Sequence, residues 1–504
     1  MTSAPSTASF DVVVLGGGVA GCVLASRLSE DAGLSVCLVE AGPDYGPRPD
    51  DWPQKVLNAR ALPRDDVWER HAPVHRIRGR VLGGSSCVNG CWNTWGSAAD
   101  HDEWSRAGGP RWTAAAMEPY RERAVRRMGL RQVPDGELSA WSRAALDAAR
   151  ELGYGEVDMA RPGAPGYGSP LINAVDGRRW NAAFAYLDAE TRRRPNLSVL
   201  DQVTADRLIV RGGRVDGVVV HGSGGGGRHT VSGGLYVVAC GTFGSPELLM
   251  RSGIGPAGHL RESGITPAVD LPGVGANLID QPGVFLPLVP TPELNAALAA
   301  KDERGELYVS RVLVRTASGR CPEGSWDVHV LPSAGAPLFG SLPSGQYEAG
   351  VSAFLMKPVS RGVVRLRSAD HTAPLHIDPG FLSDADGHDV AVLRSGLETA
   401  RELAGSTAFK GLAALPPGTP AHELPEADLG ARLGTYWHPV GTCAMGPESD
   451  PAAVVDGEGR VRGVPNLRVA DASVLPTVPA ANTQLPVLAL AEMLAEAITT
   501  APAS

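Results

Sequence analysis

Residues 10–21 read FDVVVLGGGVAG, and this segment decides the fold class of the chain. Its first half, Val12 to Leu15, is a short apolar run rich in β-branched residues, as in a buried parallel strand. Gly16, Gly18 and Gly21 follow at the spacing GxGxxG, and apolar residues then recur at helical spacing. The segment therefore predicts a strand, a tight glycine turn and a helix.

A second apolar run, Val36 to Val39, continues this pattern and ends at the acidic residue Glu40. In such a unit the glycines let backbone N–H groups approach a pyrophosphate at the helix N-terminus, and the acid accepts a ribose hydroxyl. A GxGxxG motif alone also occurs in ordinary loops, but here the strand, the helix and the acid are all present. The unit predicts a dinucleotide site and does not separate FAD from NAD.

The composition is that of a large protein with more than one domain, since the chain has 504 residues and is 43% hydrophobic. A net charge of −9 without a long basic run argues against nucleic acid as a partner. The seven cysteines are scattered without a CxxC pair, so we expect no metal site and a reduced, cytoplasmic location. Residues 1–9 lack a signal-peptide pattern, and we expect no membrane span.

Several segments are rich in glycine, proline or polar residues. Residues 77–96 mix such residues with apolar ones, which fits either backbone that lies close to a ligand or an ordinary glycine-rich turn. Residues 113–153 predict helix, and the Gly/Pro-rich residues 154–182 predict an excursion over the surface. The arginines interpreted as solvated charges are Arg178, Arg179, Arg192, Arg193 and Arg194.

Two kinds of strand pattern alternate along the rest of the chain. Buried runs in residues 197–241, with a flexible connection at 222–227, and again at 467–471 predict a discontinuous nucleotide-binding domain. Residues 307–366 alternate apolar and polar side chains, which predicts an antiparallel sheet. The segments expected in that sheet are 307–309, 312–314, 327–331, 351–356 and 363–366. The helices expected in this part are 245–252, 388–405 and 486–498.

Four blocks of the sequence resemble those of the glucose–methanol–choline (GMC) oxidoreductases and occur in the order found in that family. The resemblance extends over nearly the whole chain. The blocks are residues 16–21 with 40–42, residues 79–89, residues 241–246 with 252–255 and 271–278, and residues 438–446 with 469–473 and 482–483.

The resemblance implies an α/β fold with a discontinuous Rossmann-like FAD-binding domain and a substrate domain built on an antiparallel β-sheet. It implies oxidation of a small-molecule alcohol to an aldehyde or ketone, with hydride passing to flavin N5 and electrons to oxygen or another acceptor. The FAD domain is expected to comprise residues 1–133, 194–285 and 436–504. The substrate domain is expected to comprise residues 134–193 and 286–435.

The resemblance also implies that His438 is the catalytic base and that Asn482 is its partner. Pro439 favours an extended backbone at His438, and an imidazole with an ordinary pKa of about 6.5 accepts a proton at neutral pH. The residues expected to bind FAD are Gly16, Gly18, Gly21, Glu40, Ala41, Gly83, Ser86, Asn89, Gly90, Val203, Gly241, Asp471, Ala472, Asn482 and Thr483. Trp437, Phe354 and Met356 are expected to wall the substrate pocket, although such residues in strands are often plain core.

Two positions depart from the family pattern. Gln281 stands where relatives usually have histidine, so the role of that corner is left open. Val88 stands where some relatives attach FAD covalently to a histidine, so non-covalent FAD is expected. His329 and His376 have no motif around them and are interpreted as packed or surface residues.

Other functions occur on the same fold. Some relatives are lyases that cleave hydroxynitriles, and others are light-driven decarboxylases of fatty acids. A flavoprotein that only binds FAD is disfavoured because His438 and Asn482 both occur within their motifs. The electron acceptor and the identity of the alcohol are not legible in the sequence.

Overall fold

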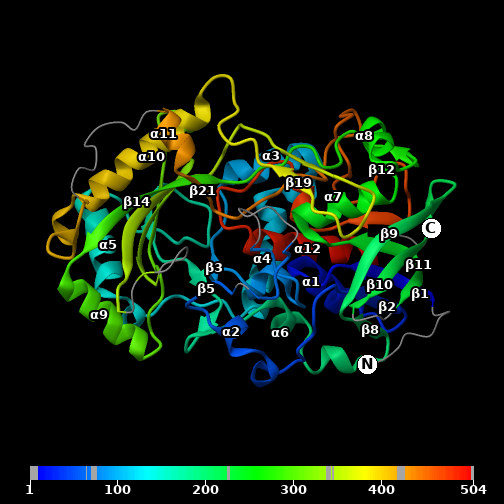
Figure 1. Ribbon diagram of the computed structural model, residues 1–504, viewed down its shortest axis with the longest axis horizontal. Helices are drawn as coiled ribbons and strands as arrows, with labels where there is room; N and C mark the ends of the chain where they lie inside the picture. The colour runs from blue at the N-terminus through cyan, green and yellow to red at the C-terminus, as the bar shows by residue number, and fades with distance from the viewer. Residues whose placement is uncertain are drawn as a thin grey trace.

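A computed structural model of the protein describes residues 9–63, 65–69, 77–223, 227–336, 342, 345–416 and 426–500, without the side chains of residues 426 and 427. Within this part of the chain, two seven-stranded sheets lie toward opposite ends of an elongated molecule (Figure 1). One sheet carries the expected parallel strands, and the other is antiparallel. The expected α/β fold class is therefore confirmed.

The first sheet is built on the buried apolar runs. Its five parallel strands are, in spatial order, β8 (Leu197–Leu200), β2 (Val36–Val39), β1 (Ser9–Leu15), β11 (Arg228–Val238) and β22 (Leu467–Val469). The first half of β11 also pairs in antiparallel fashion with β10 (Arg214–Gly222), which pairs with β9 (Val203–Arg211). The expected connection at 222–227 joins β10 to β11, and residues 224–226 lie outside the described residues.

Three helices pack in series beside this sheet. α1 (Val19–Leu28) packs against α12 (Gln484–Thr499), and α12 packs against α4 (Ala114–Arg127). α12 begins two residues before the expected start, because Pro486 lies in the first turn, where its missing N–H needs no partner. α7 (Gly241–Arg251) likewise begins earlier than expected, directly after β11.

The second sheet confirms the expected antiparallel architecture. Its main path is β20 (Ala413–Ala414), β14 (Pro282–Pro290), β17 (Glu348–Leu355), β16 (Val328–Gly335), β15 (Leu313–Thr316) and β4 (Gly166–Gly168), and β21 (Leu433–Thr435) pairs with β14. One face, with Val330 and Val351, packs in a core with α10 (His388–Ala404) and α5 (Ala140–Glu151). The opposite face carries Leu331, Ser352 and Phe354, which line a cavity.

The expectation of a surface excursion at 154–182 is right only for the first part of the segment, where residues 161–164 are exposed, and wrong for the second part. β4 is a buried strand of the second sheet, and α6 (Ala182–Tyr186), which follows, is buried against α1. Arg179 is 2% exposed and donates to the carbonyl oxygens of Ala61 and Asn89, each at 2.9 Å, so it is not a solvated charge. Glycine and proline content marks irregular backbone, but burial depends on distant residues.

Other expectations differ in detail. Residues 113–153 form two helices, α4 and α5, rather than one. Residues 307–309 form no strand, and β18 (Val363–Arg365) pairs with β19 (His376–Asp378) outside the large sheet. Strand β14 was not expected, because its prolines are unusual within a sheet, and the expected domain boundary at 285/286 falls inside it.

The remaining elements are short or lie around the two sheets. They are α2 (Gln54–Leu57), α3 (Ala98–Gly108), α8 (Ala257–Glu262), α9 (Pro292–Glu303), α11 (Glu426–Ala431), β3 (Trp92–Asn93), β5 (Leu171–Ile172), β6 (Ala174–Val175), β7 (Arg178–Arg179), β12 (Ile254–Gly255) and β13 (Val269–Asp270).

No helix in the described residues is apolar and long enough to cross a membrane. All seven cysteines are free thiols.

Candidate active site

A cavity of about 610 Å³ is lined by residues of both sheets. Gly16 and Glu40 line it from the carboxyl ends of β1 and β2, and Ser352 and Phe354 line it from β17. The carboxyl edge of a parallel sheet is the usual place for a nucleotide, and the volume lies within the range of ligand pockets.

The glycine turn fits a pyrophosphate. Gly16 has φ +102°, and a Cβ there would lie 2.5 Å from the carbonyl oxygen of Ala239, so only glycine is tolerated. A Cβ on Gly18 would meet open space, and Gly18 caps α1 without a side-chain hydrogen bond. The N–H groups of the first turn of α1 have no intrahelical partners, so this helix end can accept an anion from the cavity.

Glu40 braces this turn. Its Oε2 accepts from the N–H of Gly17 and its Oε1 accepts from the N–H of Gly42, each at 2.7 Å. Burial raises the pKa of Glu40 to about 7, against the effect of these two donors. Each carboxylate oxygen keeps a second lone pair, and Glu40 lines the cavity, so it can still accept a ribose hydroxyl.

Most of the residues expected to bind the cofactor line this cavity. Gly21 does not, because it packs α1 onto the turn, where a Cβ would lie 1.8 Å from the carbonyl oxygen of Gly16. Gly83 does not either, and its N–H donates to the carbonyl oxygen of Gly17 at 2.7 Å. The residues that do are Gly16, Gly18, Glu40, Ala41, Ser86, Asn89, Gly90, Val203, Gly241, Asp471, Ala472, Asn482 and Thr483.

The backbone around His438 is held in an unusual conformation. Trp437 has φ +60°, a left-handed value that non-glycine residues rarely adopt. Three hydrogen bonds fix it: Arg78 Nη2 to the Trp437 carbonyl at 2.7 Å, Trp437 N–H to Thr435 Oγ1 at 3.0 Å, and His438 N–H to Asp280 Oδ1 at 2.8 Å. Sequence reasoning missed Arg78, which lies 359 residues before Trp437.

The hydrogen bonds of Gln281 assign the tautomer of His438. Gln281 Nε2 donates to the carbonyl oxygens of Met356 and Pro479 at 3.1 and 2.8 Å. Its Oε1 is therefore the atom that faces His438 Nδ1 at 2.7 Å, and an amide oxygen can only accept. His438 thus carries its proton on Nδ1, and Nε2 keeps a lone pair.

Asn482 completes this arrangement on the other side of the ring. Its Oδ1 accepts from Thr94 Oγ1 at 2.9 Å, so its Nδ2 is the atom that lies 3.3 Å from His438 Nε2. The structure therefore brings the two expected catalytic residues together, and it adds Gln281 and Thr94 to them. Gln281 was recognisable only as a departure from the family motif, and Thr94 lies within the Gly/Ser/Asn-rich segment 77–96.

The surroundings of His438 keep it neutral. Burial lowers its pKa well below the ordinary value, and the positive charge of Arg78 acts in the same direction. His329 is buried, as expected, and its own pKa is lowered to about 3, mainly by burial. His438 is therefore an unprotonated base at neutral pH.

The pH dependence follows from this shift. The neutral form of His438 is the active form, so activity should rise with pH as the imidazole loses its proton. Because the pKa is lowered, we expect the midpoint below the ordinary value of about 6.5 and a flat profile above it. Anaerobic stopped-flow measurement of substrate-driven flavin reduction from pH 4 to 9 checks this. A midpoint above 7 would contradict the assigned environment.

Aromatic side chains form one wall of the site. Tyr436 stacks on Phe354 with ring centroids 4.0 Å apart and lies 4.4 Å from the ring of His438. Phe354, Tyr436 and Trp437 line the cavity, so two of the three expected pocket residues lie there. Met356 does not; its side chain is fully buried in a core cluster, and only its carbonyl serves the site. Tyr436 was missed because no motif includes it.

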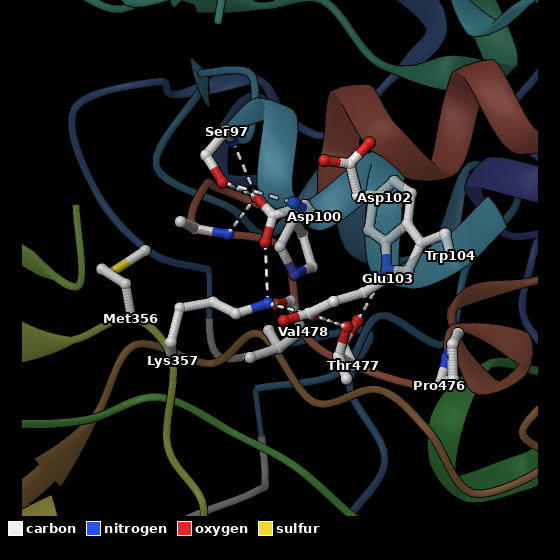
Figure 2. A network of polar contacts seen from close by, with 12 residues as sticks. Ser97, Asp100, Asp102, Glu103, Trp104, Met356, Lys357, Pro476, Thr477 and Val478 are labelled. Atoms are coloured by element: carbon white, nitrogen blue, oxygen red, sulfur yellow. Dashed lines mark hydrogen bonds and ion pairs between the residues drawn. The ribbon is translucent and has the colours of Figure 1, made fainter. Parts of the chain in front are cut away.

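Figure 2 shows a partly buried polar network around Lys357. Lys357 Nζ lies 2.7 Å from Asp100 Oδ1, 2.8 Å from Glu103 Oε2 and 3.0 Å from the carbonyl oxygen of Val478. Asp100 also accepts from the N–H of Ala480 at 3.0 Å, and Thr477 Oγ1 donates to Glu103 at 2.6 Å. The network therefore fixes the segment before Asn482, together with both carbonyl groups that hold Gln281.

Loss of the Lys357 ammonium should destabilise the fold. Burial lowers the pKa of Lys357, but Asp100 and Glu103 outweigh it and raise the pKa above its ordinary value. Lys357→Met would leave Asp100, which is fully buried, without its counter-charge. We expect a loss of about 2–3 kcal/mol of unfolding free energy, somewhat less than for a fully buried pair because Lys357 is 22% exposed. Urea unfolding of the two proteins measures this, and an equal midpoint would contradict it.

The geometry defines a class of protein: a dinucleotide-binding enzyme with a neutral histidine–asparagine pair on the cofactor cavity. Two family models described as GMC oxidoreductase match residues 10–283 and 358–491. The chain belongs to the GMC oxidoreductase family. Membership supports an oxidoreductase with FAD as its cofactor.

Several relatives match almost end to end. A 5-(hydroxymethyl)furfural oxidase from Methylovorus sp. (strain MP688) is 34% identical over 97% of this chain and 99% of its own length. The mitochondrial choline dehydrogenase of Homo sapiens is 33% identical over 98% of this chain and 90% of its own. The crystal structure of pyridoxine 4-oxidase from Mesorbium loti superposes with a TM-score of 0.84 at 30% identity, covering 98% of this chain and all of that one.

Proposed function

We propose that the protein oxidises the CH–OH group of a small-molecule alcohol to an aldehyde or ketone, with FAD as the hydride acceptor. The observation that carries this is the pair His438–Asn482: Nε2 of the neutral imidazole lies 3.3 Å from Asn482 Nδ2, and both residues line the same cavity as the glycine turn. The relatives support the reaction class, because 5-(hydroxymethyl)furfural, choline and pyridoxine all bear hydroxyl groups.

The residues would divide the work as follows. In the complex, Asn482 Nδ2 would donate to the alcohol oxygen in place of its contact with His438 Nε2, so that the lone pair on Nε2 accepts the hydroxyl proton. The Nδ1–H bond to Gln281 Oε1 orients the ring and remains in place when the imidazole becomes positive. When bound, FAD would supply the redox chemistry as the hydride acceptor, with oxygen or another acceptor as the final oxidant.

The glycine turn and the residues around it would hold FAD without a covalent bond. The uncapped N-terminus of α1 would bind the pyrophosphate, and Glu40 would bind the ribose. Val88 lines the cavity and has no nucleophilic atom. We also propose a cytoplasmic location, because all seven cysteines are free thiols. The division into domains stays a prediction.

Non-covalent attachment has a simple test. Acid precipitation of the purified holoenzyme should release all yellow flavin into the supernatant, because nothing links it to Val88. The absorbance of pellet and supernatant after full denaturation measures this. Flavin that stays with the washed pellet would show a covalent link.

The proposed function is tested by anaerobic mixing of the holoenzyme with a panel of aryl, alkyl, amino and sugar alcohols. At least one alcohol should bleach the flavin and give an equal amount of aldehyde or ketone. Oxygen and a dye, added afterwards in separate samples, identify the acceptor. A hydroxynitrile that is cleaved while the flavin stays oxidised would show a lyase instead.

A further inference from the structure

A buried arginine without an ion-pair partner lines the same cavity. Arg311 is 2% exposed, and its Nε and Nη2 atoms have no hydrogen-bond partner. No carboxylate forms an ion pair with it within the described part of the chain; its polar neighbours there are the ring and hydroxyl group of Tyr308 and, at longer range, the carboxylate of Glu137. Burial of a permanent charge without an ionic partner is costly, so such a group points to a missing anion.

Neighbouring arginines are satisfied in ways that Arg311 is not. Arg60 also lines the cavity and pairs with Asp302 Oδ1 at 3.3 Å. Arg315, which is buried to the same degree, donates to the carbonyl oxygens of Ala164 and Arg161 at 2.9 and 3.2 Å. Among these three, only Arg311 has neither a carboxylate nor a carbonyl partner for its N–H groups.

The guanidinium of Arg311 is preorganised for a planar anion. Its Cζ lies 3.5 Å from the centroid of the Tyr308 ring, which is stacking distance. The stack stabilises the cation through its face and leaves the N–H groups along its edge for other partners. A carboxylate in the same plane can accept two parallel hydrogen bonds from such an edge.

Strand register places Arg311 away from His438. Arg315 pairs with His329, and the N–H of Ala334 donates to the carbonyl oxygen of Val309 at 2.8 Å, so Arg311 lies opposite the region of Ser333. His329 lies at the end of β16 beside Tyr436, the neighbour of His438. Ser333 is four residues further along the strand, roughly 13 Å at the usual rise per residue.

The floor between these two ends belongs to the cavity-facing side of the second sheet. Phe354, Leu331, Ser352 and Ser333 all line the cavity. A substrate held at both ends would therefore lie along this sheet, with its hydroxyl group at His438.

We propose that Arg311 binds a carboxylate of the substrate, so that the substrate class is alcohols that carry a carboxylate remote from the reacting hydroxyl group. This inference rests on the proposed function, because the bound molecule is a substrate only if the protein oxidises alcohols. The anion site itself can be tested without turnover. Arg311, at the far end of the cavity, would then determine which alcohols bind, because His438 and Asn482 contact only the reacting hydroxyl group.

The test compares binding of straight-chain carboxylates of six to twelve carbons with binding of the matching primary amides. Titration calorimetry on the FAD-loaded protein measures both series without any reaction. We expect at least one carboxylate to bind about 10–100-fold more tightly than its amide, as for hydrogen bonds to a charged group. Arg311→Gln should abolish this preference while it changes amide binding less than about threefold.

Arg60→Gln is the matched control, because it removes an equal charge from the same cavity but from a residue that already has a carboxylate partner. It should keep the preference for carboxylates. FAD content and the thermal midpoint show whether each variant is folded. Arg311→Lys, which keeps the charge without the planar fork, should retain part of the preference.

The outcomes separate this inference from the proposed function. Equal binding of carboxylates and amides by the wild type, or an unchanged preference in Arg311→Gln, would overturn the role of Arg311. The same holds if Arg311→Gln weakens the amides as much as the carboxylates, because the arginine would then serve the cofactor or the fold. Failure of every alcohol to bleach the flavin would overturn the proposed function and leave the calorimetric result standing.

Discussion

Replacement of His438 with alanine is expected to slow anaerobic reduction of the flavin by an alcohol roughly 10²–10⁴-fold, the usual effect of a positioned general base. This corresponds to about 3–5 kcal/mol of barrier. The reason is that His438 Nε2 carries the lone pair that faces Asn482 and the cavity. Stopped-flow absorbance of the bound flavin measures the rate directly.

Asn482→Ala is the companion variant and should cost less, because it removes a hydrogen bond to the alcohol oxygen rather than the proton acceptor. His438→Ala should keep a near-normal FAD content, since the residues expected to hold the pyrophosphate and ribose are those of the glycine turn and Glu40; FAD content is measured for both variants. If His438→Ala reduced its flavin at the wild-type rate with the same pH profile, another group would have to be the base.

Replacement of Gln281 with leucine is expected to slow the same step roughly 10²–10³-fold, although Gln281 acts only through His438. Without the Oε1 acceptor at 2.7 Å, the proton on Nδ1 has no partner, and the imidazole can move it to Nε2. A histidine in the wrong tautomer cannot accept the substrate proton, and that defect is severe in serine proteases. The measurement is again anaerobic flavin reduction across pH.

Gln281→Glu is the control for this positioning role. It keeps an acceptor for Nδ1–H but adds a negative charge, so the pKa of His438 should rise and the midpoint of the pH profile should move upward. Its rate at high pH should exceed that of Gln281→Leu. A merely structural role would lower both rates without this shift in pH dependence. Gln281→Leu with a rate within about threefold of the wild type would disprove the tautomer assignment.

The first domain was predictable because its signals are local. The run from Val12 to Leu15 is buried as a parallel strand, and Glu40 lies beside the glycine turn as its position in the sequence indicates. His438 and Asn482 were found because each lies inside a motif, although only the structure brings them within 3.3 Å.

The rest of the site depends on contacts between distant residues. Gln281 and His438 are 157 residues apart, and the two carbonyl groups that decide the orientation of the amide come from two further segments. In the sequence, nothing distinguishes Arg311 from an ordinary surface arginine; only the structure shows that it is buried against the ring of Tyr308. Strand β14 was not predicted for a different reason: its three prolines, at 282, 287 and 290, are unusual within a sheet and obscure the strand pattern.

The central claim is that an alcohol gives its hydride to the bound flavin while His438 takes the proton. It is tested most directly by a single anaerobic turnover with an alcohol that the panel identifies, in its ordinary form and with deuterium on the reacting carbon. The account predicts that the flavin bleaches in step with one equivalent of aldehyde or ketone and that deuterium slows the bleaching several-fold. Product that forms while the flavin stays oxidised would contradict it.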